Sequence, residues 1–136
     1  MAALDRFVEA QDPVWGSVLA ELRRGRKTSH WMWFVFPQIA GLGRTDTARF
    51  FAIADAAEAR AYLAHPVLGP RLREAATALL AHRGQSAEAI LGGIDAIKLR
   101  SAMTLFDAVA PGGVFAEVLD AFYGGVRDPE TLRRLG

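Results

Sequence analysis

The segment at positions 25–38 carries the residues best suited to chemistry, because it sets cations beside an aromatic run. Six of the eight residues from Trp31 to Gln38 are apolar. Such a run must be largely buried, since each aromatic side chain covers a large apolar area. Polar and cationic groups beside it predict a pocket that stacks a planar ring and holds an anionic or hydroxyl-rich group. The residues of this segment predicted to bind the ligand are Arg26, Lys27, Ser29, Trp31, Trp33 and Gln38.

His30 is the candidate catalytic residue of this segment. It follows Thr28 and Ser29, whose hydroxyl groups can cap a helix that begins at the histidine. Free N–H groups at such a helix N-terminus favour a phosphate. A purely structural interpretation stays open beside this one, in which the tryptophans fill the core and His30 caps a helix or packs against it.

Lys98 begins a second candidate, an expected helix over about 96–110 with Asp95 as its cap. It is notable because the chain has 14 arginines and only two lysines. A desolvated lysine can bind phosphate or act in catalysis, with Ser101 one turn along the helix as a ligand. Asp95 and Asp107 are the candidate catalytic carboxylates. Alternatively, Lys98 lies at the surface and Ser101 bonds to a carbonyl of its own helix.

Length and composition limit the classes of protein that fit. A chain of 136 residues suits a single domain, 1–136, and 51% hydrophobic residues are enough for a core. A net charge of +1 argues against a surface devoted to nucleic acid. The absence of cysteine excludes disulfides and thiolate ligands, and three histidines separated by 35 and 17 residues do not indicate a metal site. We expect neither a metal nor another cofactor.

The sequence also predicts a cytoplasmic protein without a membrane partner. Residues 1–6 lack the pattern of a secretory signal. The longest apolar run, 31–37, is far shorter than the ~20 residues of a membrane span. Nothing in the sequence indicates an oligomeric state.

The candidate residues must be positioned by helices, which the sequence pattern predicts along most of the chain. We expect a mainly α fold, a single compact domain with about six to eight helices and at most a short strand pair. Caps at Asp12, Asp55 and Ser86, a terminating Gly25 and an opening Pro129 set the boundaries. Positions 48–54 fit either a short helix or a strand. The expected helices are a short one around 4–8, then 13–24, 55–64, 66–82, 86–91, 96–110, 114–123 and 129–135.

Three motifs in this order resemble the DUF1810 family, small and mostly bacterial domains without an assigned function. They are Gly-Arg-Lys-x-Ser-His-Trp-Met-Trp-Phe-x-Phe-Pro-Gln at 25–38, Tyr-Leu-x-His-Pro-x-Leu-Gly-x-Arg-Leu at 62–72 and Asp-x-x-Lys-Leu-x-Ser-x-Met-Thr-Leu-Phe at 95–106. A weaker resemblance is to the NADAR group, which includes N-glycosidases acting on ribosylated substrates. The early glutamate of that group is absent here, so only His30 carries over.

Two functions follow as hypotheses. In the first, a pocket binds a nucleotide or ADP-ribose-like small molecule and has N-glycosidase-like activity, with Asp95 or Asp107 stabilising an oxocarbenium-like state. This hypothesis requires His30 and Lys98 to face one dry hollow. In the second, the chain is a non-catalytic helical module that binds a protein or nucleic acid. The basic residues that would serve the second are Arg23, Arg24, Arg26 and Lys27.

Overall fold

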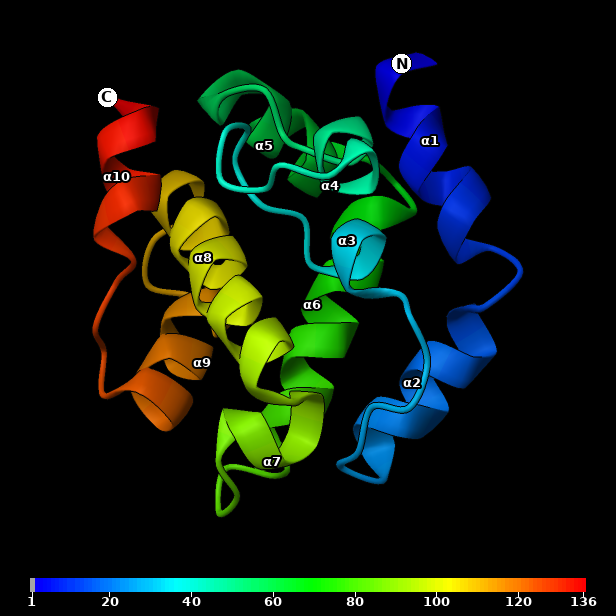
Figure 1. Cartoon of the computed structure of the whole chain (residues 1–136), viewed down its shortest axis with the longest axis vertical. Helices are drawn as coiled ribbons and strands as arrows, with labels where there is room; N and C mark the ends of the chain where they lie inside the picture. The colour runs from blue at the N-terminus through cyan, green and yellow to red at the C-terminus, as the bar shows by residue number, and fades with distance from the viewer. Residues whose placement is uncertain (1) are drawn as a thin grey trace.

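A computed structural model describes residues 2–136 as a bundle of helices joined by loops (Figure 1). Seven of the ten helices in this part of the chain have seven or more residues, and no strand is formed there. The mainly α prediction is therefore confirmed. The helices are α1 (Ala2–Gln11), α2 (Trp15–Arg23), α3 (Met32–Val35), α4 (Asp46–Phe50), α5 (Ala56–Ala64), α6 (Leu68–Leu80), α7 (Ala87–Leu91), α8 (Gly93–Val109), α9 (Val114–Tyr123) and α10 (Pro129–Leu135).

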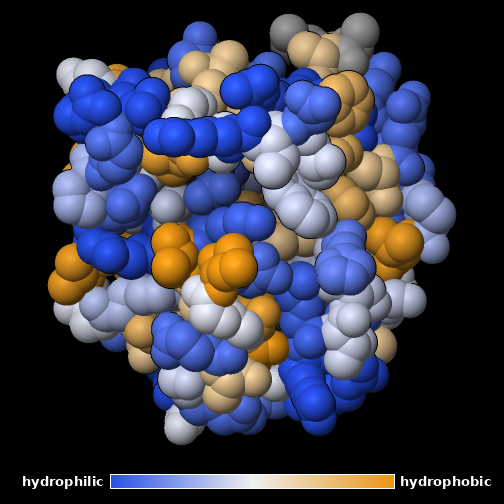
Figure 2. Space-filling model, in the orientation of Figure 1, coloured by the Kyte–Doolittle hydropathy of each residue, from blue (hydrophilic) through white to orange (hydrophobic). Residues whose placement is uncertain are grey.

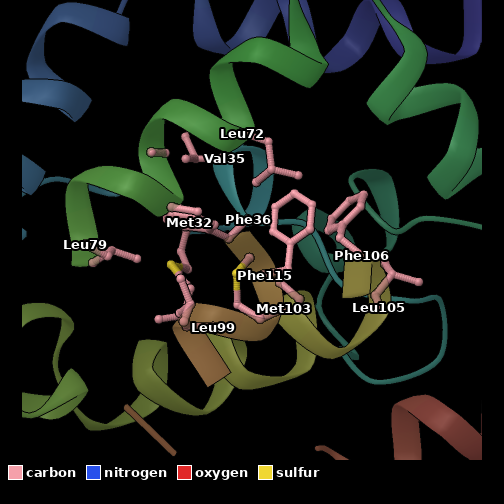
Figure 3. Packing of buried hydrophobic residues seen from close by; sticks show 14 of the residues in the cluster. Met32, Val35, Phe36, Leu72, Leu79, Leu99, Met103, Leu105, Phe106 and Phe115 are labelled. Atoms are coloured by element: carbon pink, nitrogen blue, oxygen red, sulfur yellow. The ribbon is translucent and has the colours of Figure 1, made fainter. Parts of the chain in front are cut away.

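Helix α8 lies at the centre of the packing and contacts α5, α7, α9 and α10. It can occupy this place because seven consecutive residues, 101–107, are buried. Figure 3 shows the core close to it, where side chains from α3, α6 and α9 meet those of α8. The labelled core residues are Met32, Val35, Phe36, Leu72, Leu79, Leu99, Met103, Leu105, Phe106 and Phe115. None of the helices within residues 2–136 is both long enough and apolar enough to cross a bilayer.

Several boundaries follow from local signals, as predicted. Gly25 takes a φ of 76°, and its N–H donates to the Leu22 carbonyl while the next N–H donates to the Glu21 carbonyl. These two bonds make the Schellman end of α2, which a left-handed glycine allows. Ser86 caps α7 by accepting from the Ala89 N–H.

Two predicted caps are wrong. Asp12 does not cap α2, because its carboxylate lies 2.8 Å from the guanidinium of Arg71. Asp95 does not cap α8, because that helix begins two residues earlier, at Gly93, and leaves Asp95 in its first turn. Both carboxylates instead pair with a cation distant in the sequence, Asp12 with Arg71 and Asp95 with Lys27.

The loop between α3 and α4 returns to the segment before α5. Ile39 and Ile53 form a single parallel bridge, with the Ile53 N–H donating to the Gln38 carbonyl over 2.9 Å. The 48–54 segment therefore divides, with its first part in α4 and its last part in the bridge. This single bridge is within the predicted limit of at most a short strand pair.

Candidate functional site

Both lysines of the chain converge on Asp95. Lys27 Nζ lies 2.8 Å from Asp95 Oδ2, and Lys98 Nζ lies 3.8 Å from Asp95 Oδ1. The Lys27 backbone N–H also donates to the Ile90 carbonyl, at 2.8 Å, which ties the loop after α2 to α7. Two segments some seventy positions apart in the sequence thus bring two ammonium groups to one carboxylate. We call this set the Asp95 cluster.

Each of these lysines also lies over a tryptophan ring. Lys27 Nζ is 5.1 Å from the ring centroid of Trp31, and Lys98 Nζ is 4.6 Å from that of Trp33. Such contacts are attractive, because the negative face of the ring lies beneath the positive charge. Trp31 is only 1% exposed, so the predicted stacking of a ligand on this ring is wrong. Trp33 is half-buried, and Lys98 covers one of its two faces.

Glu21 determines the shape of the loop that carries the first lysine. Its carboxylate accepts from the N–H groups of Thr28 and Ser29, at 2.6 and 2.9 Å, and from the Ser29 hydroxyl. It also accepts from the indole N–H of Trp31, at 3.0 Å. The backbone N–H groups near His30 that were predicted to bind a phosphate therefore donate to the Glu21 carboxylate instead. Ser29 is committed to this contact, and α3 begins at Met32 rather than at His30.

Two opposed effects set the pKa of the Glu21 carboxyl. Burial raises the pKa, because the charged form loses its water. The hydrogen bonds from Ser29, Thr28 and Trp31 outweigh burial and lower the pKa to about 2. Glu21 therefore stays ionised and keeps the loop in place down to strongly acidic pH.

Lys98 borders two hollows of very different size. One opens at the surface, has a volume of about 420 Å³ and is lined by Trp33, Lys98 and residues 91–95. The other is an inner cavity of about 10 Å³ between α3, α4 and Lys98, with Gln38 in its wall. The inner space is no larger than one water molecule needs. The predicted dry pocket is thus filled by side chains, and of the two hollows beside Lys98 the open one is the larger.

The other predicted residues of the aromatic segment do not meet in this hollow. His30 and Arg26 are exposed on the loop before α3, and neither is among the residues that line the two hollows beside Lys98. The expectation that His30 and Lys98 share one dry hollow is not met. The backbone before α3 turns to satisfy Glu21, which leaves the imidazole outside.

Ser101 and Asp107 belong to a different part of α8. Ser101 Oγ donates to Asp128 Oδ2 over 3.1 Å, so this serine supports the cap of α10. Asp107 Oδ2 accepts from a guanidinium nitrogen of Arg127 at 3.1 Å. Both side chains thus fasten the segment after α9 to α8. Neither lines the hollows beside Lys98, which removes them from the candidate site.

The prediction missed two contributors. Glu21 lies three positions after the buried Val18, so its place on the apolar stripe of α2 is a signal of an enclosed carboxylate. Residues 91–93 form a wall of the hollow, and Gly92, with a φ of 91°, marks the turn between α7 and α8. Within residues 2–136, no three His, Cys, Asp or Glu side chains lie close enough together to hold a metal ion.

The comparisons with known proteins agree with the first resemblance. A family model described as "Protein of unknown function (DUF1810)" matches residues 1–135. The chain is also similar to the crystal structure of the conserved hypothetical protein Rv1873 from Mycobacterium tuberculosis. The TM-score is 0.91 and the identity 48%, over 97% of this chain and 95% of that one. A search of the curated proteins finds no match.

These matches do not bear out the weaker resemblance to the NADAR group. The motifs that indicated a relationship, at 25–38, 62–72 and 95–106, all lie within the region covered by the family model. The chain belongs to the DUF1810 family, a family of proteins of unknown function.

Proposed function

We propose that this protein binds a small anionic ligand of the nucleotide class in the surface hollow beside Trp33 and Lys98. The observation that carries the proposal is the charge of the Asp95 cluster. Two ammonium groups lie within 4 Å of one carboxylate, so the cluster has a surplus of one positive charge. The side chains of Lys27, Lys98 and Asp95 are only 8%, 23% and 19% exposed, which limits neutralisation of that surplus by water.

The two lysines of the Asp95 cluster have different roles in this proposal. Lys27 makes the short ion pair and holds Asp95 in place. Lys98 lines the hollow and is the cation available to a phosphate or carboxylate group. Helix α8 begins in the same wall, and the positive end of its dipole favours an anion there.

The wall of the hollow also has apolar parts suited to a ring. Trp33 and Leu91 line it, and Ile94 at its edge is 74% exposed. Figure 2 shows hydrophobic side chains standing among hydrophilic ones on the face where α8 lies in front. We propose that the ligand's ring packs here against the edge or the uncovered face of Trp33.

Cleavage of an N-glycosidic bond in such a ligand is the finer form of this proposal. Of the two predicted carboxylates, only Asp95 lines the hollow, so it is the one that would stabilise an oxocarbenium-like state. We expect His30 and Arg26 to contribute only from the exposed loop beside the cluster.

Binding is tested by titrating the protein with ADP-ribose and AMP, and with adenosine as an uncharged comparison. We expect the phosphates to raise the melting temperature and adenosine to leave it unchanged. Lys98→Ala should weaken phosphate binding by about tenfold or more, since one charged contact is lost. Arg60→Ala, at an exposed position on α5, is the control and should bind as the wild type does. Equal affinities for Lys98→Ala and wild type would contradict the site, and release of a free base would establish cleavage.

The nucleic-acid form of the second hypothesis depends on the four basic residues at the end of α2 and in the loop after it. Arg23 pairs with Glu74, Arg24 donates to Thr28, and Lys27 faces Asp95. Two of the four basic residues, Arg23 and Lys27, thus pair with a carboxylate, which reduces the net charge of this surface. We expect no salt-dependent binding of RNA or DNA, and a steep salt dependence at low ionic strength would reverse this assignment.

A further inference from the structure

We infer that Lys98 is an amine nucleophile that forms an imine with an aldehyde group carried by the anionic ligand of this hollow. The inference rests on the proposed function for the identity of the hollow. It goes further in assigning a covalent step, one reacting atom and a substrate class. That class is an anion bearing an aldehyde, such as the open-chain form of a sugar phosphate.

The two lysines are not equivalent within the Asp95 cluster. Lys27 has the short contact, 2.8 Å, and its side chain is only 8% exposed between the carboxylate and Trp31. Lys98 Nζ, at 3.8 Å, is too far from the carboxylate for a hydrogen bond. Its side chain is 23% exposed and borders the open hollow. Lys27 therefore neutralises Asp95, which leaves the Lys98 nitrogen available to a ligand.

The surroundings of Lys98 also fix where its nitrogen lies. The nitrogen is held 4.6 Å from the ring centroid of Trp33, and the helical backbone of α8 anchors the other end of the side chain. A side chain held at both ends loses less freedom when it reacts, which increases the rate of attack on a bound carbonyl. Imine formation needs such a positioned amine and a nearby group that relays protons.

The step is balanced without an added oxidant or reductant. Lys98 first gives one ammonium proton to Asp95 through a solvent water molecule, and the neutral nitrogen then attacks the aldehyde carbon. The carbonyl oxygen takes up this proton and a second one from the nitrogen, and it leaves as water. The product is a protonated imine that carries the same single positive charge as the original ammonium group. Its attraction to Asp95 is therefore preserved, and so is the charge that holds the ligand's anionic group.

The imine is tested by trapping it in the whole protein. Pyridoxal 5′-phosphate serves as the probe, since it joins a planar ring, a phosphate and an aldehyde, and borohydride reduction makes the adduct permanent. Peptide mass mapping separates Lys98 from Lys27 and the N-terminal amine. We expect adduct at Lys98 to form about tenfold faster than at the exposed lysine introduced by Arg60→Lys, because the hollow positions the probe. Equal rates at the two positions would overturn the inference.

Two further arms separate this inference from the proposed function. Lys98→Arg removes the nucleophile, so it should give no adduct at position 98, whereas Arg60→Ala should be labelled at Lys98 as the wild type is. If wild-type protein binds AMP but yields no trapped Lys98, the imine is excluded and the binding function stands. The preference for pyridoxal 5′-phosphate over pyridoxal should be larger at Lys98 than at the lysine introduced by Arg60→Lys, a comparison that corrects for the internal hemiacetal of pyridoxal. Equal preferences at the two positions would contradict the anion site while leaving Lys98 a nucleophile.

Discussion

Glu21→Gln is expected to lower the free energy of unfolding by about 3 kcal/mol at pH 7. The carboxylate is 3% exposed and accepts from two backbone N–H groups, the Ser29 hydroxyl and the Trp31 indole. A glutamine presents one oxygen and one N–H₂ group to donors that all require an acceptor. At least one buried donor is then unsatisfied.

The loss of stability caused by Glu21→Gln should become smaller as the pH falls. In the folded protein the pKa of Glu21 is lowered from 4.5 to about 2. A carboxyl with a lowered folded-state pKa contributes stability that is complete above the unfolded pKa and is lost as pH falls through the folded one. Wild-type stability should therefore fall between about pH 4.5 and pH 2 in a way that Glu21→Gln does not share. Urea unfolding followed by circular dichroism at several pH values measures both slopes.

Glu74→Gln is the matched control for this measurement. Glu74 is an exposed carboxylate whose ion pair with Arg23 spans 3.8 Å, so its loss should change stability by less than about 1 kcal/mol. Parallel curves for Glu21→Gln and wild type from neutral to acidic pH would contradict the role of Glu21. They would show that the loop before α3 is held by other contacts.

Gly69→Ala is expected to destabilise the protein by about 3 kcal/mol, although alanine favours helices more than glycine does. A Cβ atom at Gly69 would lie 2.1 Å from the Leu63 carbonyl oxygen and 2.9 Å from its carbon. These are backbone atoms of α5, so no side chain can turn aside to relieve the contact. The corner between α5 and α6 must open instead, and the melting temperature should fall by about 10 °C.

Gly16→Ala supplies the opposite expectation at another helical glycine. Gly16 lies on α2 with no atom within 4 Å of the added Cβ, so the substitution should stabilise the protein by about 0.5–1 kcal/mol. Calorimetry of both variants gives the comparison. A Gly69→Ala protein as stable as the wild type would show that the close approach of α5 and α6 is not required.

Local sequence signals determined most of the helices. Ser86, Asp55 and Gly25 act within three or four residues of their own positions, and each acts as predicted. The apolar stripe of α6 was also predictable, because burial on a helix follows a fixed period. The residues of that stripe, all buried, are Leu68, Leu72, Ala75, Ala76, Leu79 and Leu80.

The scarcity of lysine in the sequence pointed to the two cations that meet on Asp95. In a chain with arginine at 14 of its 16 basic positions, the two lysines at 27 and 98 were unusual, and the structure places both on one carboxylate. The rarity of lysine thus indicated two residues of the candidate site from the sequence alone. Their shared partner, Asp95, was predicted to be a cap and instead became the centre of the cluster.

Only the tertiary structure decided which groups meet. Glu21 occupies the donors that the sequence had assigned to a ligand, and Ser101 and Asp107 turn to the segment before α10 rather than to the hollow. The physical reason is that a cap or a helical stripe depends on neighbours within about one turn. A polar side chain, in contrast, takes whichever partner long-range packing brings within hydrogen-bond distance, and the order of residues along the chain does not specify that partner.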